Sequence, residues 1–165
     1  MSVRFPSVGN VRELPELLTQ AIPAEWEDYN GHVNIQYYMR LYEQGGWPLV
    51  GQLGLDESYF RDRRCGLFDL EHHLFYLSEV YAGDEVSVHC RLLDKTAKRF
   101  HGMMFLLNQT RNALAGTMEF VTSGADLDAR RTAVFPDDIA VRISAMVDAQ
   151  RGLDWDAPVC GVMSA

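Results

Sequence analysis

Apolar and polar positions are arranged along the chain in three different patterns. From Ile35, apolar side chains recur at the spacing of an amphipathic helix, which predicts a long helix in the first half. Residues 86–92 alternate strictly between apolar and polar types, which is the two-residue period of a strand. Residues 99–109 are almost entirely apolar after His101, which is typical of a strand covered on both faces. The sequence therefore predicts one central helix and a sheet.

Further strands are predicted on either side of these segments. Residues 17–26 form a first strand, whose end Pro23 places at an edge or a bend. Residues 65–81 form one long aromatic-rich strand. Residues 114–120 alternate again, and residues 123–126 are expected to close that strand because they are rich in turn formers.

The ends of the two predicted helices are marked by glycine and proline. Gly45, Gly46 and Pro48 should distort or end the regular part of the first helix, although the small pair also lets another element approach closely. A second helix is expected at residues 136–151, because Pro136 suits a first turn and the two aspartates after it complement the helix dipole.

The order of these elements is strand, long helix, four strands and terminal helix. A run of strands after one helix predicts an α+β fold, in which an antiparallel sheet of about five strands wraps around the long helix. We expect residues 1–165 to form a single domain, with its core at about residues 18–136 and the C-terminal helix at about 136–151.

Composition and charge exclude several classes of function. The chain has 165 residues, a formal net charge of −8 and a pI near 5.0, which argues against nucleic acid as the main partner. It does not argue against coenzyme A, whose phosphates need only a local basic patch. No apolar run is long enough to span a membrane, and residues 1–11 lack a signal-peptide block, so a cytoplasmic protein is expected.

The cysteines and histidines show no spacing of a metal site. Cys65, Cys90 and Cys160 are an odd number at unrelated spacings, and no CxxC pair occurs. Adjacent His72 and His73 should point to opposite faces of a strand, so they cannot easily share an ion. The sequence predicts no disulfide framework, no metal and no cofactor other than the coenzyme A part of a substrate.

The segment between the first strand and the helix carries the candidate chemistry. It reads Asp28-Tyr29-Asn30-Gly31-His32-Val33-Asn34. Free N–H groups at a helix start can polarise a thioester carbonyl, and a nearby carboxylate can attack it or deprotonate a water. The same residues also suit a simple turn and helix cap, which the spacing alone does not distinguish.

This segment resembles the D-x-x-G-H-[MV]-N signature of 4-hydroxybenzoyl-CoA-thioesterase-like hotdog proteins. The likeness covers about residues 18–136, includes the Gly83-Asp84 turn, and is closest to the betainyl-CoA thioesterases of carnitine catabolism, in which Met usually stands at the position of Val33. The resemblance implies a hotdog fold, hydrolysis of a small acyl-CoA, and Asp28 as nucleophile or general base.

The predicted substrate-binding residues come from this segment, the helix and three later positions or pairs. They are Tyr29, Gly31, His32, Val33, Asn34, Tyr37, Glu43, Glu71, His73, Lys98 and Arg99. A helical Glu such as Glu43 is more often only a solvated side chain, and most surface Arg residues bind nothing specific. Lys98 and Arg99 are candidates for the phosphates of coenzyme A.

A trimethylammonium acyl group could be held by aromatic faces and carboxylates. Aromatic residues crowd the segment and its helix, and Glu71 and Glu79 share a face if their strand is regular. Simple core packing explains the same aromatics.

Two other functions stay open on the sequence alone. They are a hotdog hydratase or dehydratase and a non-catalytic acyl-CoA-binding protein. A sheet with open edges further predicts a homodimer or homotetramer.

Overall fold

The computed structural model describes residues 3–165, and the first two positions of the chain lie outside it. Its centre is an antiparallel sheet in the order β1-β3-β4-β5-β2, with the short β6 paired to β5. The strands are β1 (Glu16–Ala21), β2 (Cys65–Tyr76), β3 (Glu85–Lys95), β4 (Arg99–Asn108), β5 (Ala113–Asp126) and β6 (Arg131–Thr132). The predicted α+β architecture is confirmed.

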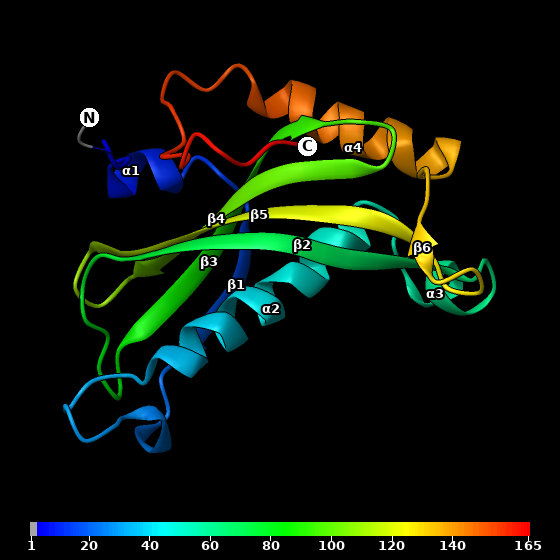
Figure 1. The fold of residues 1–165 in the computed structure, drawn as a ribbon. Coiled ribbons are helices and arrows are strands. Elements are labelled where there is room, and N and C mark those ends of the chain that lie inside the picture. The colour runs from blue at the N-terminus through cyan, green and yellow to red at the C-terminus, as the bar shows by residue number, and fades with distance from the viewer. Residues whose placement is uncertain (1–2) are drawn as a thin grey trace.

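Helices cover the sheet on two sides. The long helix α2 (Ile35–Gln52) crosses one face, while α1 (Val8–Val11) and the C-terminal segment lie over the other (Figure 1). We call the face toward α2 the inner face and the opposite one the outer face. The remaining elements are a single 3-10 turn η1 (Ala24–Trp26), the short α3 (Glu57–Arg61) and α4 (Asp137–Gln150).

Helix α2 runs through Gly45, Gly46 and Pro48 without a break, so the expected disruption there is wrong. The reason is close packing on the sheet. A Cβ at Gly45 would lie 2.6 Å from Cγ1 of Val88 in β3, so the glycine lets the helix touch the strand. The predicted close approach at this small pair is confirmed.

Three predicted boundaries differ from the structure. The first strand ends at Ala21, and the chain then forms η1, which contains Trp26. Strand β2 ends at Tyr76, where Leu77 and Ser78 donate to the carbonyl of Ala115. Strand β5 continues through residues 123–126, because β2 and β6 pair with it there.

Helix α4 protects one edge of the sheet. Strand β1 pairs with β3 only as far as His89. Beyond that point, the Gln150 side chain accepts from the N–H of Leu92 at 2.6 Å and donates to the carbonyl of Cys90 at 3.4 Å. The predicted C-terminal helix therefore caps the edge of β3 that β1 leaves open.

The two faces bury different side chains. The inner face carries the main apolar core, which includes Val88, Met104 and Phe120 together with Leu41 and Leu49 of α2. The outer face carries a smaller cluster under α1 and the C-terminal segment, formed by Val11, Leu14, Met103, Phe105, Leu107 and Trp155. Strand β4 is thus covered on both faces, as its apolar run predicts.

Candidate active site

The segment Asp28–Asn34, hereafter the Asp28 loop, folds as a tight hairpin. The N–H of Asp28 donates to the carbonyl of His32 at 3.0 Å, and the N–H of Gly31 donates to the carbonyl of Asp28 at 2.9 Å. Gly31 has a φ of +78°, which side-chain-bearing residues rarely adopt. Glycine is therefore needed at this point of the turn.

Two donors within the loop orient the carboxylate of Asp28. The N–H of Asn30 reaches Oδ1 at 2.8 Å, and Nδ2 of Asn34 lies 3.4 Å from Oδ2. Oδ1 of Asn34 also accepts from the N–H of Gln36 at 3.1 Å, so Asn34 is the N-cap of α2. The cap interpretation of this motif is thus confirmed, and the same geometry orients the Asp28 carboxylate.

The turn at Gly83 and Asp84 anchors the loop. The N–H of Val33 donates to the carbonyl of Val80, just before that turn, at 2.8 Å. Oδ2 of Asp84 accepts from Nδ2 of Asn108 at 2.7 Å and from Nε of Arg111 at 2.9 Å. Burial alone would raise the pKa of the Asp84 carboxyl, but these hydrogen bonds outweigh it and lower the pKa.

Few N–H groups of the loop point outward. Within residues 3–165, those of Tyr29, His32 and Ile35 have no hydrogen-bond partner, whereas the loop itself uses most of the others. Ile35 is the first residue of α2, where the N–H cannot bond within the helix and the dipole favours negative charge. This N–H is therefore available to bind an oxygen atom of a ligand.

A cavity of about 1000 Å³ opens between α2 and the inner face of β2, β4 and β5. It begins at Gln36 and Tyr37, one turn into α2 from Asn34; Asp28 itself is not among its lining residues. Six aromatic side chains line it, together with two carboxylates, those of Glu43 and Asp69, and one guanidinium, that of Arg40.

The predicted residues Tyr37 and Glu43 both line this cavity. Tyr37 stacks on Trp26 with ring centroids 4.5 Å apart and an angle of 2° between the planes. The guanidinium of Arg40 lies 5.4 Å from the centre of the same indole ring. Trp26 is therefore buried packing, and Tyr37 is the ring that faces the cavity.

A neighbouring tyrosine is fixed as a neutral phenol. Burial, with smaller effects of Tyr76 and Glu79, raises the pKa of Tyr38 to about 12. Its hydroxyl donates to the carbonyl of Ser78 at 3.3 Å. Tyr42, one turn further along α2, lines the cavity, and its buried hydroxyl has no partner within residues 3–165.

Glu71 and His73 do not join the cavity. The pairing of β2 with β5 shifts between Asp69 and Glu71, so a β-bulge at Leu70 reverses the alternation of side chains. Glu71 and His73 therefore lie on the outer face. The expectation that Glu71 shares a strand face with Glu79 is also wrong, because β2 ends at Tyr76 and Glu79 lies beyond it.

Two other residues of β2, which the sequence did not indicate as ligand-binding, lie on the inner face instead. Asp69 and His72 line the cavity, and Thr122 donates to Oδ1 of Asp69 at 2.6 Å. Glu79 lies in the loop after β2, where its carboxylate is 3.9 Å from Nε2 of His32. A regular two-residue period could not have found Asp69 and His72 together.

The other predicted residues are scattered. Val33 is 1% exposed, so its side chain belongs to the core. Tyr29 is fully exposed at the tip of the loop. Lys98 and Arg99 are exposed at the turn between β3 and β4. They lie beside Ser123 and Gly124 of β5, at the end of the sheet remote from the Asp28 loop. Within one chain, the structure does not bring them to Asp28.

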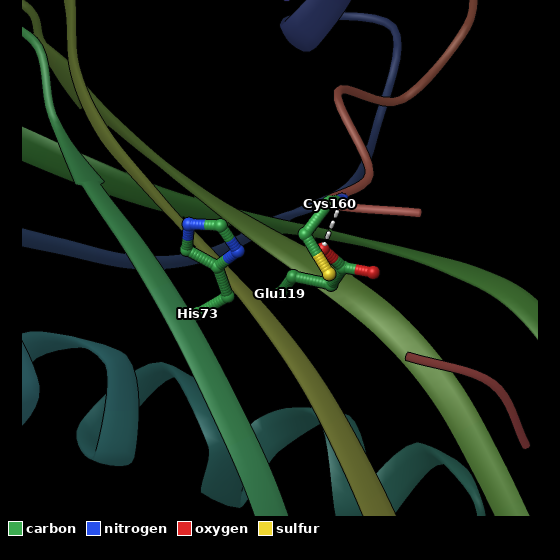
Figure 2. A group of neighbouring side chains, drawn as sticks. All are labelled: His73, Glu119 and Cys160. Atoms are coloured by element: carbon green, nitrogen blue, oxygen red, sulfur yellow. Dashed lines mark hydrogen bonds between the residues drawn. The ribbon is translucent and has the colours of Figure 1, made fainter. Parts of the chain in front are cut away.

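A separate polar cluster lies on the outer face. Ligating atoms of His73, Glu119 and Cys160 all lie within 4.8 Å of one another (Figure 2). Oε1 of Glu119 lies 2.8 Å from Nε2 of His101, and Oε2 accepts from the N–H of Cys160 at 2.7 Å. These three residues come from distant parts of the sequence, so their spacing gives no signal of a metal site.

Comparisons with known proteins identify the family of the chain. The sequence profile of the Thioesterase-like superfamily matches residues 22–143. A betainyl-CoA thioesterase from Pseudomonas aeruginosa is 32% identical over 135 residues, which are 82% of this chain and 84% of that protein. An L-carnitine dehydrogenase/betainyl-CoA thioesterase from a Rhizobium species is 25% identical over 88% of this chain, which spans only 29% of that longer protein.

Solved structures show the same fold. A Staphylococcus aureus protein in complex with CoA superposes with a TM-score of 0.81 at 25% identity, over 92% of this chain and 96% of that one.

No helix in residues 3–165 has both the length and the apolarity to cross a membrane.

Proposed function

The chain belongs to the Thioesterase-like superfamily and is an acyl-CoA thioesterase, and we propose that its substrate is betainyl-CoA and that Asp28 carries the catalysis. The predicted hotdog fold and enzyme class are thereby confirmed. The observation that carries the substrate proposal is the cavity beside α2, because aromatic rings and the carboxylates of Glu43 and Asp69 line it together.

The acyl group explains why this lining matters. A trimethylammonium group cannot donate hydrogen bonds, so aromatic faces and carboxylates are its main specific partners. Each ring contributes about 0.5–2 kcal/mol, depending on desolvation. Tyr37, Tyr42 and Trp47 supply rings, and Glu43 and Asp69 supply negative charge on either side. Sequence identity of 32% to a betainyl-CoA thioesterase supports the same substrate.

Hydrolysis proceeds at the mouth of the cavity in this proposal. The thioester carbonyl accepts from the N–H of Ile35, whose position at the start of α2 stabilises the oxyanion. Asp28, held by Asn30 and Asn34, either attacks the carbonyl carbon or takes a proton from the attacking water. The C–S bond breaks, and the thiolate leaves without strong acid assistance because a thiol pKa is about 8.5. If Asp28 itself attacks, water then hydrolyses the acyl–Asp28 anhydride and restores the carboxylate. The products are betaine and coenzyme A.

The decisive measurement compares two substrates of nearly equal shape. Betainyl-CoA and 3,3-dimethylbutyryl-CoA differ mainly in the charge of the acyl group. We expect kcat/KM, measured by thiol release, to favour the cation by at least about tenfold, or roughly 1.4 kcal/mol. Equal values would end the betaine proposal and leave the thioesterase class intact. Binding without thiol release from a wider acyl-CoA panel would favour a non-catalytic protein, and hydration of an enoyl-CoA would favour a hydratase.

A second part of the proposal concerns assembly. Strand β2 is the last in the sheet, and Phe68, Leu70 and Tyr76 on it are exposed. We propose that β2 pairs with its copy in a two-fold dimer, which removes this open edge. Antiparallel pairing carries the start of β2 in one protomer toward the end of β2 in its partner. Lys98 and Arg99 then approach the Asp28 loop of the partner, where they bind phosphates of coenzyme A.

The assembly is tested by light scattering at micromolar concentration. We expect a dimer or a tetramer built from dimers, and a monodisperse monomer would contradict the proposal. Substituting both Lys98 and Arg99 with Ala should raise KM for the acyl-CoA with little change in kcat, because phosphate contacts act on binding.

A further inference from the structure

We propose that His73, Glu119 and Cys160 bind a zinc ion on the outer face, which ties the C-terminal segment to the sheet. Figure 2 shows the three side chains converging from β2, β5 and the segment after α4. The site lies on the face of the sheet away from the cavity and takes no part in the proposed hydrolysis.

Strand pairing places two of the three proposed ligands side by side, and the C-terminal segment adds the third. His73 and Glu119 are direct cross-strand partners, so their side chains lie side by side on the outer face. Stacking on Phe75, with ring centroids 4.8 Å apart, holds the imidazole of His73. The N–H of Cys160 donates to Oε2 of Glu119 at 2.7 Å, which brings the thiol over the same pair.

The donor atoms are available to an ion. Within residues 3–165, neither the ring nitrogens of His73 nor the thiol of Cys160 has a hydrogen-bond partner. The carboxylate of Glu119 has two partners, His101 and the Cys160 N–H, but it can accept about four hydrogen bonds or metal contacts. Nε2 of His101 also fixes the orientation of that carboxylate, as outer-shell partners of metal ligands do.

Charge and chemistry both favour zinc. The Glu119 side chain is only 2% exposed, and its ion-pair partner within residues 3–165 is His101, which is charged only when protonated, so a bound cation would compensate the carboxylate whatever the state of that ring. A carboxylate and a thiolate together neutralise a divalent ion. Sulfur, imidazole and carboxylate oxygen are the ligands that zinc takes, at about 2.0–2.3 Å, which places neighbouring ligand atoms roughly 3.3–3.7 Å apart. Side-chain rotation closes the present spacing of up to 4.8 Å, and a solvent molecule completes four ligands.

The test uses the full-length chain without a polyhistidine tag. After chelation and dialysis, Co²⁺ titration should give one ion per chain and a thiolate-to-cobalt charge-transfer band, and Zn²⁺ should displace it. Zinc at a hundredfold excess over its Kd should raise Tm by about 5–10 °C. Absence of the charge-transfer band in the unsubstituted protein would overturn the proposal without any variant.

Variants then locate the ion. Cys160→Ala and His73→Gln should each lower the affinity by more than about a hundredfold, beyond the effect of losing an outer-shell partner. Cys65→Ala is the matched control, because Cys65 is an equally accessible free thiol in β2, and it should bind as the unsubstituted chain does. Undiminished binding by Cys160→Ala would overturn the proposal. So would loss of thiol release on chelation without a change in Tm, because that places the ion in the catalytic site.

Discussion

The inner and outer faces of the sheet both carry ionisable side chains, but they hold them differently. On the outer face, His89, Arg91, His101 and Glu119 are buried, and each has a hydrogen-bond partner. On the inner face, Glu43 and Asp69 are exposed at a cavity whose wall also holds the unpartnered hydroxyl of Tyr42. The buried groups of the outer face are fixed by these partners, whereas the groups of the inner face are open to the cavity and to a ligand in it.

The difference follows from what covers each face. Helix α2 lies across the inner face but leaves the cavity along β2 open. Residues of α1 and the C-terminal segment close the outer face, where the ring of Trp155 packs on Phe105 with centroids 5.6 Å apart. Arg91 donates to the backbone carbonyl of Trp155 and stacks on its ring at 4.6 Å. We therefore expect substitutions on the inner side to change catalysis, and those on the outer side to change stability.

The largest expected effect is at Asp28. Asp28→Asn keeps an acceptor for the N–H of Asn30 but removes the charge that attacks or accepts a proton. We expect kcat to fall by about 10²–10⁴-fold, as on loss of a general base, while KM and Tm change little. Thiol-release kinetics and thermal unfolding measure the two. Near-normal turnover in a folded Asp28→Asn variant would move the catalysis to Glu43.

The matching test on the outer face is Glu119→Ala. This change leaves His101 and the N–H of Cys160 without their acceptor in a buried site. We expect the free energy of unfolding to fall by about 3 kcal/mol, with kcat/KM of the folded enzyme unchanged. Urea unfolding in the presence of EDTA measures this effect apart from any metal. Glu71→Ala, at an exposed position of β2, is the control and should cost less than about 0.5 kcal/mol.

A smaller effect, on substrate preference, is expected at β2, which carries one carboxylate on each face of the sheet. Asp69 and Glu71 flank the bulge at Leu70 and lie on opposite faces. Asp69→Asn retains the acceptor for Thr122 but removes a charge from the cavity, so the preference for betainyl-CoA over its neutral analogue should fall about tenfold or to parity. Glu71→Gln should leave the preference unchanged. The reverse result would show that the face assignment is wrong for the working enzyme.

This bulge also shows what the sequence could and could not predict. Residues 86–92 of β3 pair with β4 without a register shift, so their inward and outward positions follow directly from the period. In β2, the extra residue at Leu70 changes the face of everything after it, and no local pattern marks the bulge. A regular period through β2 therefore cannot place both Asp69 and His72 on the inner face, where the structure has them.

Contacts between residues close in sequence could be predicted, whereas contacts between distant residues could not. The Asp28 loop was predictable because its turn, its cap and its carboxylate all lie within seven consecutive residues. The outer-face cluster joins residues as far apart as His73 and Cys160, and the last of these lies outside any helix or strand. Helix α2 likewise continues past Gly45 only because Val88 packs against it, a contact that helix propensity does not include.

The smallest expected effect is the pH dependence that His89 gives to the outer face. Its Nδ1 donates to the carbonyl of Leu14 at 3.1 Å, and Nε2 lies 2.9 Å from Oγ of Ser87. Because the Leu14 carbonyl can only accept, Nδ1 carries a proton, and in the neutral ring Nε2 accepts from the Ser87 hydroxyl. Burial is the main cause that lowers the pKa of His89 below its ordinary value of 6.5, although Leu14 and Glu16 oppose it.

The sign of the effect follows from proton binding. Since the pKa of His89 is lower in the folded state, the unfolded chain binds more protons as the pH falls below about 6.5. The stabilisation by the neutral ring is therefore complete above that pH and is lost as the pH falls through the folded-state pKa. One proton contributes at most about 1.4 kcal/mol per pH unit to the slope. His89→Asn keeps a donor toward Leu14 but cannot titrate, so its urea midpoint should fall less between pH 7.5 and 5.5 than that of the unsubstituted chain. Equal slopes would mean that acid acts elsewhere, and that the closure of the outer face does not depend on a neutral His89.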